Sequence, residues 1–334
     1  MSRYIVKRFL TIVPVLVGIS IIVFSFIHLI PGDPAVTMLG ERATPERVTE
    51  VRAQLGLDQP LYAQYAIYAG KVLRGDLGVS ILRGDPVLLD LIRRFPATVE
   101  LALAAICIAM LIGVPSGIVS AVWRDSFFDG CSRIIALTGV SVPIFWLGLM
   151  LAWVFGVMLG WLPTGFRLGT NVTLVSVTHF NLLDSLIAAN GQALVASLRH
   201  LILPAAALSS IPMAVITRMT RASLLEVLSQ DYIRTAESRG LPQRTVVLRH
   251  AMRNALLPVM TVTGLQVGRL LAGAILTETI FSWPGIGLWI YEAIQARDYP
   301  IVQGATLFIA TIFVLVNLIT DCLYAAVDPR IKYD

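Results

Sequence analysis

The chain has 334 residues, of which 56% are hydrophobic and only 14% are charged, and its mean hydropathy is +0.77. Soluble domains carry about 25% charged residues, so this composition excludes a water-soluble globular protein. It also excludes a disordered chain, because disorder combines low hydrophobicity with high net charge. The net charge of +5 comes from basic residues placed between long apolar runs. That pattern is typical of a membrane protein rather than a nucleic-acid-binding protein.

Long runs without Asp, Glu, Lys or Arg indicate the membrane-spanning segments. About 20 residues of helix cross roughly 30 Å of hydrocarbon. The sequence therefore predicts an all-α polytopic membrane protein with six spanning helices, at residues 9–30, 101–123, 134–166, 200–217, 255–276 and 300–320, of which 255–276 is interrupted only by Arg269.

The first apolar run follows basic residues, as the core of a secretory signal peptide does. It is longer than the roughly 7–15 apolar residues of such a core, and no small-residue cleavage site follows it. We interpret it as a retained helix. The predicted division of the chain is 1–30 for the tail and first helix, 31–96 for an extracytoplasmic segment, 97–327 for a five-helix transmembrane domain, and 328–334 for a tail.

The basic residues predict the orientation of these helices. With the N-terminus inside, 14 of the 26 basic side chains fall on cytoplasmic segments, including seven arginines between positions 218 and 253. The short outer connections would hold only Arg167, Arg199 and Arg297. By the positive-inside rule, both termini are predicted to be cytoplasmic.

Local signals predict that the segment 31–96 is folded. Thr44 can cap a helix that has Pro45 at its first position, and Gly56 can end that helix. The segment is therefore expected to be a small helical unit outside the membrane.

A second helix is predicted at 61–73, with three tyrosines on one face: Tyr62, Tyr65 and Tyr68. These tyrosines either pack on the membrane helices or contact a docking partner. Another outer connection, 160–199, gives no clear secondary-structure pattern.

Sequence motifs for catalysis are absent. A phosphate-binding loop needs a lysine after glycines, and none of the three lysines has that context. No H-E-x-x-H or G-x-S-x-G motif occurs, which leaves an intramembrane hydrolase without support. The cysteines have no metal-ligand spacing and are expected to be small, buried apolar side chains: Cys107, Cys131 and Cys322.

Ionisable residues near the membrane are candidate functional groups, because burying them is costly. They are His28, Glu100, Arg269, Glu278 and Asp321. Arg269 interrupts a spanning run and is expected to face a cavity. It either lines a path through the protein or pairs with an acid on a neighbouring helix. Glu278 and Asp321 lie near predicted helix ends, where an interfacial role is the simpler interpretation.

The segment after residue 276 is predicted to form a short re-entrant or capping element at the outer mouth of the protein. Pro284, Gly285 and Gly287 interrupt any continuous helix there. Non-helical backbone at that depth is tolerated only where it is buried or lines a wet cavity. The predicted members are Glu278, Phe281, Trp283 and Pro284; the alternative is an ordinary surface loop.

The predicted cytoplasmic loop at about 223–253 is rich in arginine. Residues 223–239 are compatible with a half-apolar, half-basic helix, which Gly240 would stop and after which Pro242 would start another. Such a helix either lies on an anionic lipid surface or fills a groove on a cytosolic protein.

This loop resembles the coupling loop of bacterial ABC importer permeases, whose pattern is E-A-A, three residues, Gly, nine residues and I-x-L-P. Alignment on Gly240 places Arg234, Thr235 and Ala236 at E-A-A and residues 250–253 at I-x-L-P. Only Ala236 and Gly240 match strictly. The departures are similar to those of the dipeptide/oligopeptide branch, in which R-T-A-x-x-x-G and R-H-A-x-R-N-A-x-x-P occur, as they do here at 234–240 and 249–258.

Other segments resemble the same branch along the whole chain. In sequence order they are P-G-D-P at 31–34, G-L-D-Q-P at 56–60, G-D-L-G at 75–78, T-E-T-I-F-S-W-P-G at 277–285, R-D-Y-P at 297–300 and D-P-R at 328–330.

The resemblance implies the type I ABC importer permease fold and a non-catalytic transport subunit in the bacterial inner membrane. It further implies a second homologous permease, two cytoplasmic ATPases that bind ATP and Mg²⁺, and an extracytoplasmic binding protein that delivers di- or oligopeptides. The chain itself would hold no cofactor, and lipids would surround it. Related permeases carry nickel, glutathione or haem. The implied ATPase-coupling residues are Asp231, Tyr232, Ile233, Arg234, Thr235, Ala236, Arg239 and Gly240.

Within this coupling helix, Tyr232 and Ile233 are expected to be apolar anchors in the ATPase groove. Arg234 and Arg239 are expected to pair with acids on its rim, and the small Ala236 would allow close approach. A proton-coupled secondary transporter is the more distant alternative, but it would need intramembrane carboxylates, of which the sequence has few.

Overall fold

The computed structural model describes residues 2–29, 33–40, 43–272 and 274–327. Within these ranges the structure is helical, and it contains no strand, only one isolated bridge between Val79 and Pro86. The expected tail at 328–334 lies outside the described residues. In chain order the first nine elements are α1 (Ser2–Leu29), α2 (Pro34–Leu39), α3 (Pro45–Leu55), α4 (Leu61–Leu73), α5 (Val87–Val122), α6 (Phe127–Ser141), α7 (Ile144–Leu151), the π-helical η2 (Ala152–Met158) and α8 (Asn181–Ile187).

The second half of the chain continues this pattern of long helices joined by short ones. Its elements are α9 (Gly191–Leu228), α10 (Asp231–Ser238), α11 (Gln243–Thr245), the π-helical η3 (Val246–Ala251), α12 (Met252–Leu271), α13 (Ile275–Ile280), α14 (Ile286–Gln295) and α15 (Tyr299–Val327).

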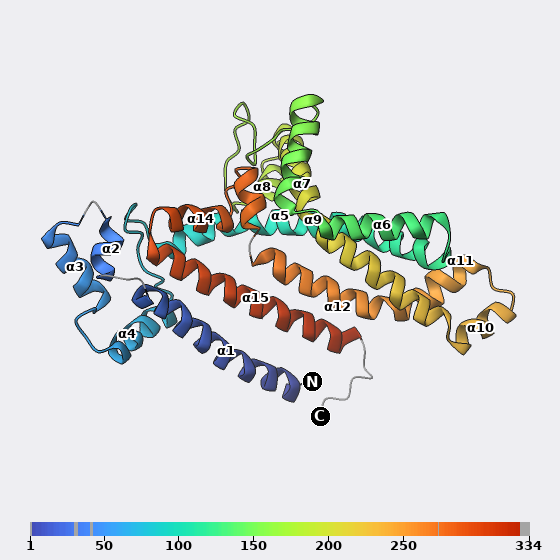
Figure 1. Cartoon of the computed structure of the whole chain (residues 1–334), viewed down its shortest axis with the longest axis horizontal. Helices are drawn as coiled ribbons and strands as arrows, with labels where there is room; N and C mark the ends of the chain where they lie inside the picture. The colour runs from blue at the N-terminus through green and yellow to red at the C-terminus, as the bar shows by residue number, and fades with distance from the viewer. Residues whose placement is uncertain (1, 30–32, 41–42, 273, 328–334) are drawn as a thin grey trace.

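The long helices form an elongated bundle, in which α5, α6, α9, α12 and α15 run side by side and α1 lies along one edge (Figure 1). Helices α2, α3 and α4 gather at one end of the bundle, and α10 and α11 lie at the other. Three helices are each long and apolar enough to cross a membrane: Val87–Val122, Gly191–Leu228 and Tyr299–Thr320. The remaining predicted spans are also helical, at α1, at α6 with α7, and at α12.

Helices α5 and α9 form the centre of the bundle because small residues let their backbones approach closely. A Cβ at Gly117 would lie 2.7 Å from the carbonyl oxygen of Thr217 and 2.6 Å from the Cβ of Thr220. The apolar core continues along both helices, with Leu101 and Ile216 fully buried. Substitution of Gly117 would therefore push the two central helices apart.

The third predicted span, 134–166, is wrong as a single helix. Helix α6 ends at Ser141, and the α7–η2 pair leaves it at an angle of 104°. Pro143 is the N-cap of α7 and has no N–H to continue the ladder of α6. The chain therefore turns sideways at this point, and the residues after Met158 have no regular structure until α8.

The fifth predicted span, 255–276, and the predicted helix 223–239 also have different boundaries in the structure. Helix α12 ends at Leu271, five residues before the predicted end of the span, and α13 starts after a break. The predicted helix 223–239 is divided at Ser229 and Gln230, and its first part is the end of α9. Cys107 is exposed on the bundle surface rather than buried, and Cys131 is half-buried.

The segment predicted to lie outside the membrane, residues 31–96, contains the two helices predicted for it, but α5 begins at Val87, so residues 87–96 belong to the long helix and not to a separate unit. The Thr44 hydroxyl accepts a hydrogen bond from the N–H of Arg47, Pro45 begins α3, and Gly56 ends it with a φ of 64°. The carboxylates of Asp33 and Asp58 both bind Arg52, at 2.5 and 2.6 Å, so one guanidinium joins the start of α2 and the turn before α4 to α3.

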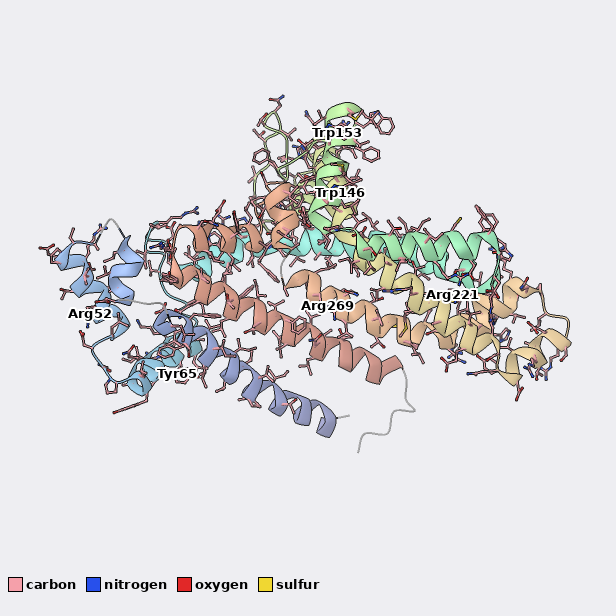
Figure 2. The ribbon with its side chains drawn as sticks, viewed as in Figure 1. Arg52, Tyr65, Trp146, Trp153, Arg221 and Arg269 are labelled. Carbon is pink, nitrogen blue, oxygen red and sulfur yellow. The ribbon has the colours of Figure 1, made fainter. Side chains whose placement is uncertain are left out.

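Two of the three tyrosines of α4 pack on the membrane helices, as the first of the two interpretations expects. The rings of Tyr65 and Tyr68 pack against Phe24 of α1, with centroids 5.5 and 5.7 Å away, and the Tyr65 hydroxyl is 2.8 Å from that of Ser20. Figure 2 shows Tyr65 at this junction of α4 with α1. The third tyrosine, Tyr62, is 78% exposed. The tyrosine face therefore attaches the outer segment to the bundle.

Candidate functional site

Helix α10 lies at one end of the bundle and is held there by its inner face. Ile233 is fully buried and Ala236 is 8% exposed, and both pack against Leu224 of α9 and against Val246 and Val247 of η3. The Tyr232 hydroxyl accepts a hydrogen bond from the Asn254 amide at 2.8 Å. The expectation that Ile233 and Ala236 meet a partner is therefore wrong, because both side chains are covered by the chain itself.

The outer face of α10 is polar and charged. Its exposed residues include Thr235, Glu237, Ser238, and the pair formed by Asp231 and Arg234 at 3.7 Å. An ion pair this exposed contributes little to stability, so these charges remain available to a partner. The predicted roles of Arg234 and Arg239 toward acidic groups fit their exposure, and Tyr232, 39% exposed, is the one predicted apolar anchor that reaches the surface.

Gly240 ends α10 as predicted. Its φ is +75°, and its N–H donates to the carbonyl of Glu237 while the N–H of Leu241 donates to Ala236. A Cβ at this position would have nothing within 4 Å, so glycine is required for its backbone conformation and not for space. Pro242 then caps α11, which confirms the predicted restart.

A buried ion-pair cluster lies beside this region, and the sequence reasoning missed it. The carboxylate of Asp129, fully buried in α6, accepts from Nε and Nη2 of Arg221 in α9 at 2.8 and 2.9 Å. It also accepts from the Ser120 hydroxyl of α5 and from the N–H of Asp125. The sequence predicts Arg221 in the cytoplasmic loop, whereas in the structure it lies in α9, which continues to Leu228. Figure 2 shows Arg221 within the bundle.

The predicted outer-mouth element is a buried helix–turn–helix formed by α13 and α14. Glu278 is fully buried, and its carboxylate accepts from the Thr98 hydroxyl of α5 at 2.8 Å and from the N–H of Leu288 at 2.9 Å. The same Thr98 hydroxyl accepts from the N–H of Ile286 at 2.9 Å. Thr98 therefore joins α5 to both ends of the turn, and the alternative of an ordinary surface loop is wrong.

Glycines make room for this carboxylate. A Cβ at Gly285 would lie 2.5 Å from the Glu278 carboxyl group, and one at Gly287 would lie 3.0 Å from it. The glycines thus interrupt the helix, as predicted, and also form the pocket that holds Glu278.

The two aromatic residues of the turn anchor it to the bundle. Trp283 is 1% exposed and donates through Nε1 to the carbonyl of Ala97 at 2.8 Å. Phe281, also 1% exposed, packs with Leu203 and Ala207 of α9. Pro284 is exposed at the tip of the turn.

A second missed pair covers this turn. Arg167, from the irregular segment after η2, binds Glu100 of α5 at 2.6 Å, and its guanidinium lies 5.6 Å from the ring centroid of Trp283. The N–H of Leu182 donates to the other oxygen of Glu100 at 2.8 Å. Both charged residues lie at the edges of predicted spans, and this position was the one sign in the sequence that they have a function. Their pairing was not predictable, because 67 residues separate them in the sequence.

Arg269 does not join this cluster. It lies in the last turn of α12 and is exposed, and none of the ion pairs found among the described residues involves it. Figure 2 shows it where α12 ends, part-way along the bundle. Pairing with an acid of a neighbouring helix in this chain is therefore not observed in the described part of the structure.

Two family descriptions match the chain. Residues 113–333 match the binding-protein-dependent transport system inner membrane component, and residues 1–102 match the N-terminal part of such a membrane component. The chain belongs to this family. It is thus an inner membrane component of a binding-protein-dependent transport system, with an all-helical permease fold.

Relatives extend over the full chain. A dipeptide transport system permease protein of Alkalihalophilus pseudofirmus is 50% identical over 333 residues, covering 100% of both chains. One from Escherichia coli is 48% identical over 337 residues, covering 100% of this chain and 99% of the relative. A glutathione transport system permease protein of Escherichia coli is 41% identical over 333 residues, covering all of both chains.

A solved structure supports the same fold. A chain of the MetNI methionine ABC transporter in an inward-facing conformation aligns with a TM-score of 0.51 at 14% identity. The alignment covers 71% of this chain and 96% of that one.

Proposed function

We propose that this permease forms half of the translocation path of an ATP-driven importer of di- and oligopeptides. The observation that carries the proposal is the identity of 47–50% over the whole chain to permeases named for dipeptide or di/tripeptide transport. The relative named for glutathione transport supports a second candidate substrate, itself a peptide, at 41% identity.

The proposed partners are a second homologous permease, two cytoplasmic ATPases and an extracytoplasmic binding protein. The chain contributes no ATP chemistry, since it has no phosphate-binding loop; ATP and Mg²⁺ belong to the ATPases. In this assembly the α10 end of the bundle is cytoplasmic, as are both termini, and the outer segment with α2, α3 and α4 faces the binding protein.

The coupling surface is the polar outer face of α10. Its inner face is already packed on α9 and η3, so a push on the exposed face moves the ends of those helices directly. Arg234, Arg239 and Thr235 supply the contacts, and Tyr232 supplies an aromatic edge. A charged, exposed surface on a rigidly seated helix suits docking to a soluble ATPase better than insertion into lipid, which requires an exposed apolar face.

The turn between α13 and α14 is proposed to act at the outer gate. It closes against α5 through Thr98 and Trp283, and Arg167 covers it from the other side. The turn is attached by a few specific contacts, and releasing them would open the outer end of the path.

The experiment that tests the function is uptake of a labelled dipeptide into proteoliposomes that contain both permeases and the ATPases, with the loaded binding protein outside. We expect uptake that requires ATP inside and is unaffected when a proton gradient is collapsed. Unlabelled dipeptide and glutathione, each in excess, distinguish the two candidate substrates by competition. Uptake driven by a proton gradient in vesicles that hold the permease without ATPases would refute the proposal in favour of a secondary transporter.

A further inference from the structure

A groove lies between α5, α6 and α9, which run side by side in the bundle (Figure 1). Its volume is about 340 Å³, within the range of sites that hold small molecules. On α5 the wall extends from Ile112 to Val119, about 10 Å of helix. The apolar lining residues are Ile112, Pro115, Val119, Phe128, Ile135, Ala136, Met213 and Ala214, and the other lining residues are Ser116, Cys131, Ser132 and Thr217.

The walls of this groove belong to membrane-spanning helices. Helices α5 and α9 are each long and apolar enough to cross a membrane, and α6 is the first half of the bent pair that meets the same criterion. No lining residue is charged. Ile112 and Ile135, on two walls, are 50 and 62% exposed. The groove is therefore open to the hydrocarbon of the bilayer and not to a soluble protein.

Two serine hydroxyls interrupt the apolar wall. Ser116 of α5 and Ser132 of α6 are both half-buried. A hydroxyl in a membrane helix can donate to the carbonyl one turn earlier, as Thr217 does to Met213 at 2.8 Å. Neither serine hydroxyl makes a hydrogen bond among the residues that the structure describes. Both can therefore donate to a ligand that carries oxygen acceptors.

Aromatic side chains gather where α5 turns into α6, at the mouth of the groove. Trp123, Phe127 and Phe128 are 54, 80 and 61% exposed. The ring centroids of Trp123 and Phe128 are 5.8 Å apart, and those of the two phenylalanines are 6.1 Å apart. Exposed tryptophans are enriched at the membrane–water boundary, so this aromatic cluster indicates the depth at which lipid headgroups begin.

Two arginines flank the aromatic cluster. The side chains of Arg124 and Arg133 are 67 and 56% exposed. Arg133 lies 3.5 Å from Asp129, but the charge of Asp129 is already balanced by the buried two-point contact with Arg221. At the surface the two arginines face Asp125 alone, which leaves a net charge of +1 at the mouth. The mouth therefore attracts an anionic group.

We propose that this groove binds one phospholipid molecule. An acyl chain lies along the apolar wall between α5 and α6. Its ester oxygens accept from Ser116 and Ser132, and its phosphate lies between Arg124 and Arg133 at the mouth. A phospholipid combines the three chemistries that the groove offers in sequence, namely hydrocarbon, neutral oxygen acceptors and an anion that forms charge-assisted hydrogen bonds with guanidinium groups.

The test measures binding of dioleoyl phosphatidylglycerol to the full-length permease, purified in detergent and stripped of lipid. The thermal unfolding midpoint is followed as the lipid is added, and native mass spectrometry counts the bound molecules. We expect the midpoint to rise until one lipid per chain is bound. Dioleoylglycerol has the same chains without the phosphate, and it should bind about tenfold more weakly or worse.

Two pairs of variants locate the site. Arg124→Gln with Arg133→Gln should weaken binding of the phospholipid about tenfold or more, while Asp129 keeps Arg221. Arg244→Gln with Arg249→Gln removes the same charge from exposed positions near α10 and should not change the affinity.

The second pair fills the groove. Ser132→Phe places a ring in it and should abolish retention of the lipid. Leu137→Phe is its control, since Leu137 is 62% exposed on α6 and does not line the groove.

The remaining outcomes overturn the inference. Equal affinities of the parent and both arginine variants would mean that lipid covers the chain without a specific site. Equal binding of dioleoylglycerol would remove the phosphate from the recognition. Retention of the lipid by Ser132→Phe would place it elsewhere on the surface. If Ser132→Phe fails to fold, the two arginine variants still decide the question.

Discussion

Asp129 and Arg221 form a two-point ion pair that joins α6 to α9 next to the end of the bundle that carries α10. The side chain of Asp129 is fully buried, and the side chain of Arg221 is 22% exposed. The Ser120 hydroxyl, from α5, donates to the same carboxylate, so that one acid holds three helices together.

Asp129→Asn should destabilise the folded permease by about 2–3 kcal/mol, because the amide cannot accept from both Arg221 nitrogens and leaves that cation without its counter-charge. The measurement is the thermal unfolding midpoint in detergent. Asp125→Asn is the control, since the Asp125 side chain is 72% exposed and its ion pair with Arg124 lies at the surface. Equal midpoints for the two variants would show that the pair contributes no stability.

Gly240→Val should leave expression and membrane assembly intact and abolish the stimulation of ATP hydrolysis by loaded binding protein. The physical reason is the φ of +75°, at which a residue with a Cβ costs on the order of 1 kcal/mol or more and would re-aim the end of α10. The control is Arg244→Gln, which removes a charge from an exposed neighbouring position. If stimulation falls with the lost charge and not with the valine, α10 acts on lipid and not on the ATPase.

Gly285→Ala should destabilise the turn between α13 and α14 and reduce uptake. The added methyl group would lie 2.5 Å from the carboxyl group of Glu278, and overpacking of this kind typically costs about 1–3 kcal/mol. Gly191→Ala is the matched control, because a Cβ there meets nothing within 4 Å. The comparison uses unfolding midpoints and peptide uptake; unchanged values for Gly285→Ala would mean that the turn adapts freely and is no gate.

The outer connection at 176–184 should loosen in acid. The carboxylate of Asp184 accepts from the N–H and hydroxyl of Thr178 at 2.8 and 2.7 Å and from the N–H of Val177 at 3.2 Å. Burial alone would raise the pKa of Asp184, but these hydrogen bonds outweigh it and lower the pKa below the usual value for aspartate. The stabilisation is thus complete above the ordinary aspartate pKa of about 3.9 and is lost as the pH falls through the lower folded value.

Hydrogen exchange of this connection, followed from pH 7 to pH 2, measures the effect. Protection should be constant from pH 7 to pH 5 and fall only below about pH 4. Asp184→Asn should exchange faster than the parent from pH 7 to pH 5, since its amide group cannot accept from both Val177 and Thr178, and this difference should shrink in acid as the parent carboxylate is protonated. A constant difference between parent and variant down to pH 2 would contradict the link to Asp184.

The orientation is testable by cysteine labelling in cells, after the three native cysteines, Cys107, Cys131 and Cys322, are replaced by alanine. Tyr62→Cys should react with a membrane-impermeant reagent from outside, because Tyr62 is 78% exposed on α4. Ser238→Cys, exposed at the end of α10, should react only after the membrane is opened. The reversed pattern would place α10 outside and remove the basis for its coupling role.

Local signals in the sequence predicted the elements that local interactions determine. Helix α3 begins at Pro45 after the Thr44 cap and ends before Gly56, and α4 occupies the predicted 61–73. The exposed turn residue Gly240 was predicted for the same reason: its role depends on its own backbone angles.

Contacts between distant segments were not predictable from one sequence. Asp129 and Arg221 are 92 residues apart, and Thr98 and Glu278 are 180 apart. The inward direction of Ile233 depends on where η3 lies, which the pattern of apolar residues in α10 does not specify. The sideways turn at Pro143 was missed because an apolar run has the same composition whether it continues or bends within a membrane.

The packing of Ile233 has a practical consequence for chimaeras between related permeases. Because Ile233 and Ala236 interlock with Leu224, Val246 and Val247, a graft of α10 alone would bring foreign side chains against host neighbours. The smallest exchangeable module is therefore about residues 224–252, from the end of α9 to the start of α12. Engineers who wish to redirect this permease to another ATPase should transplant that block whole.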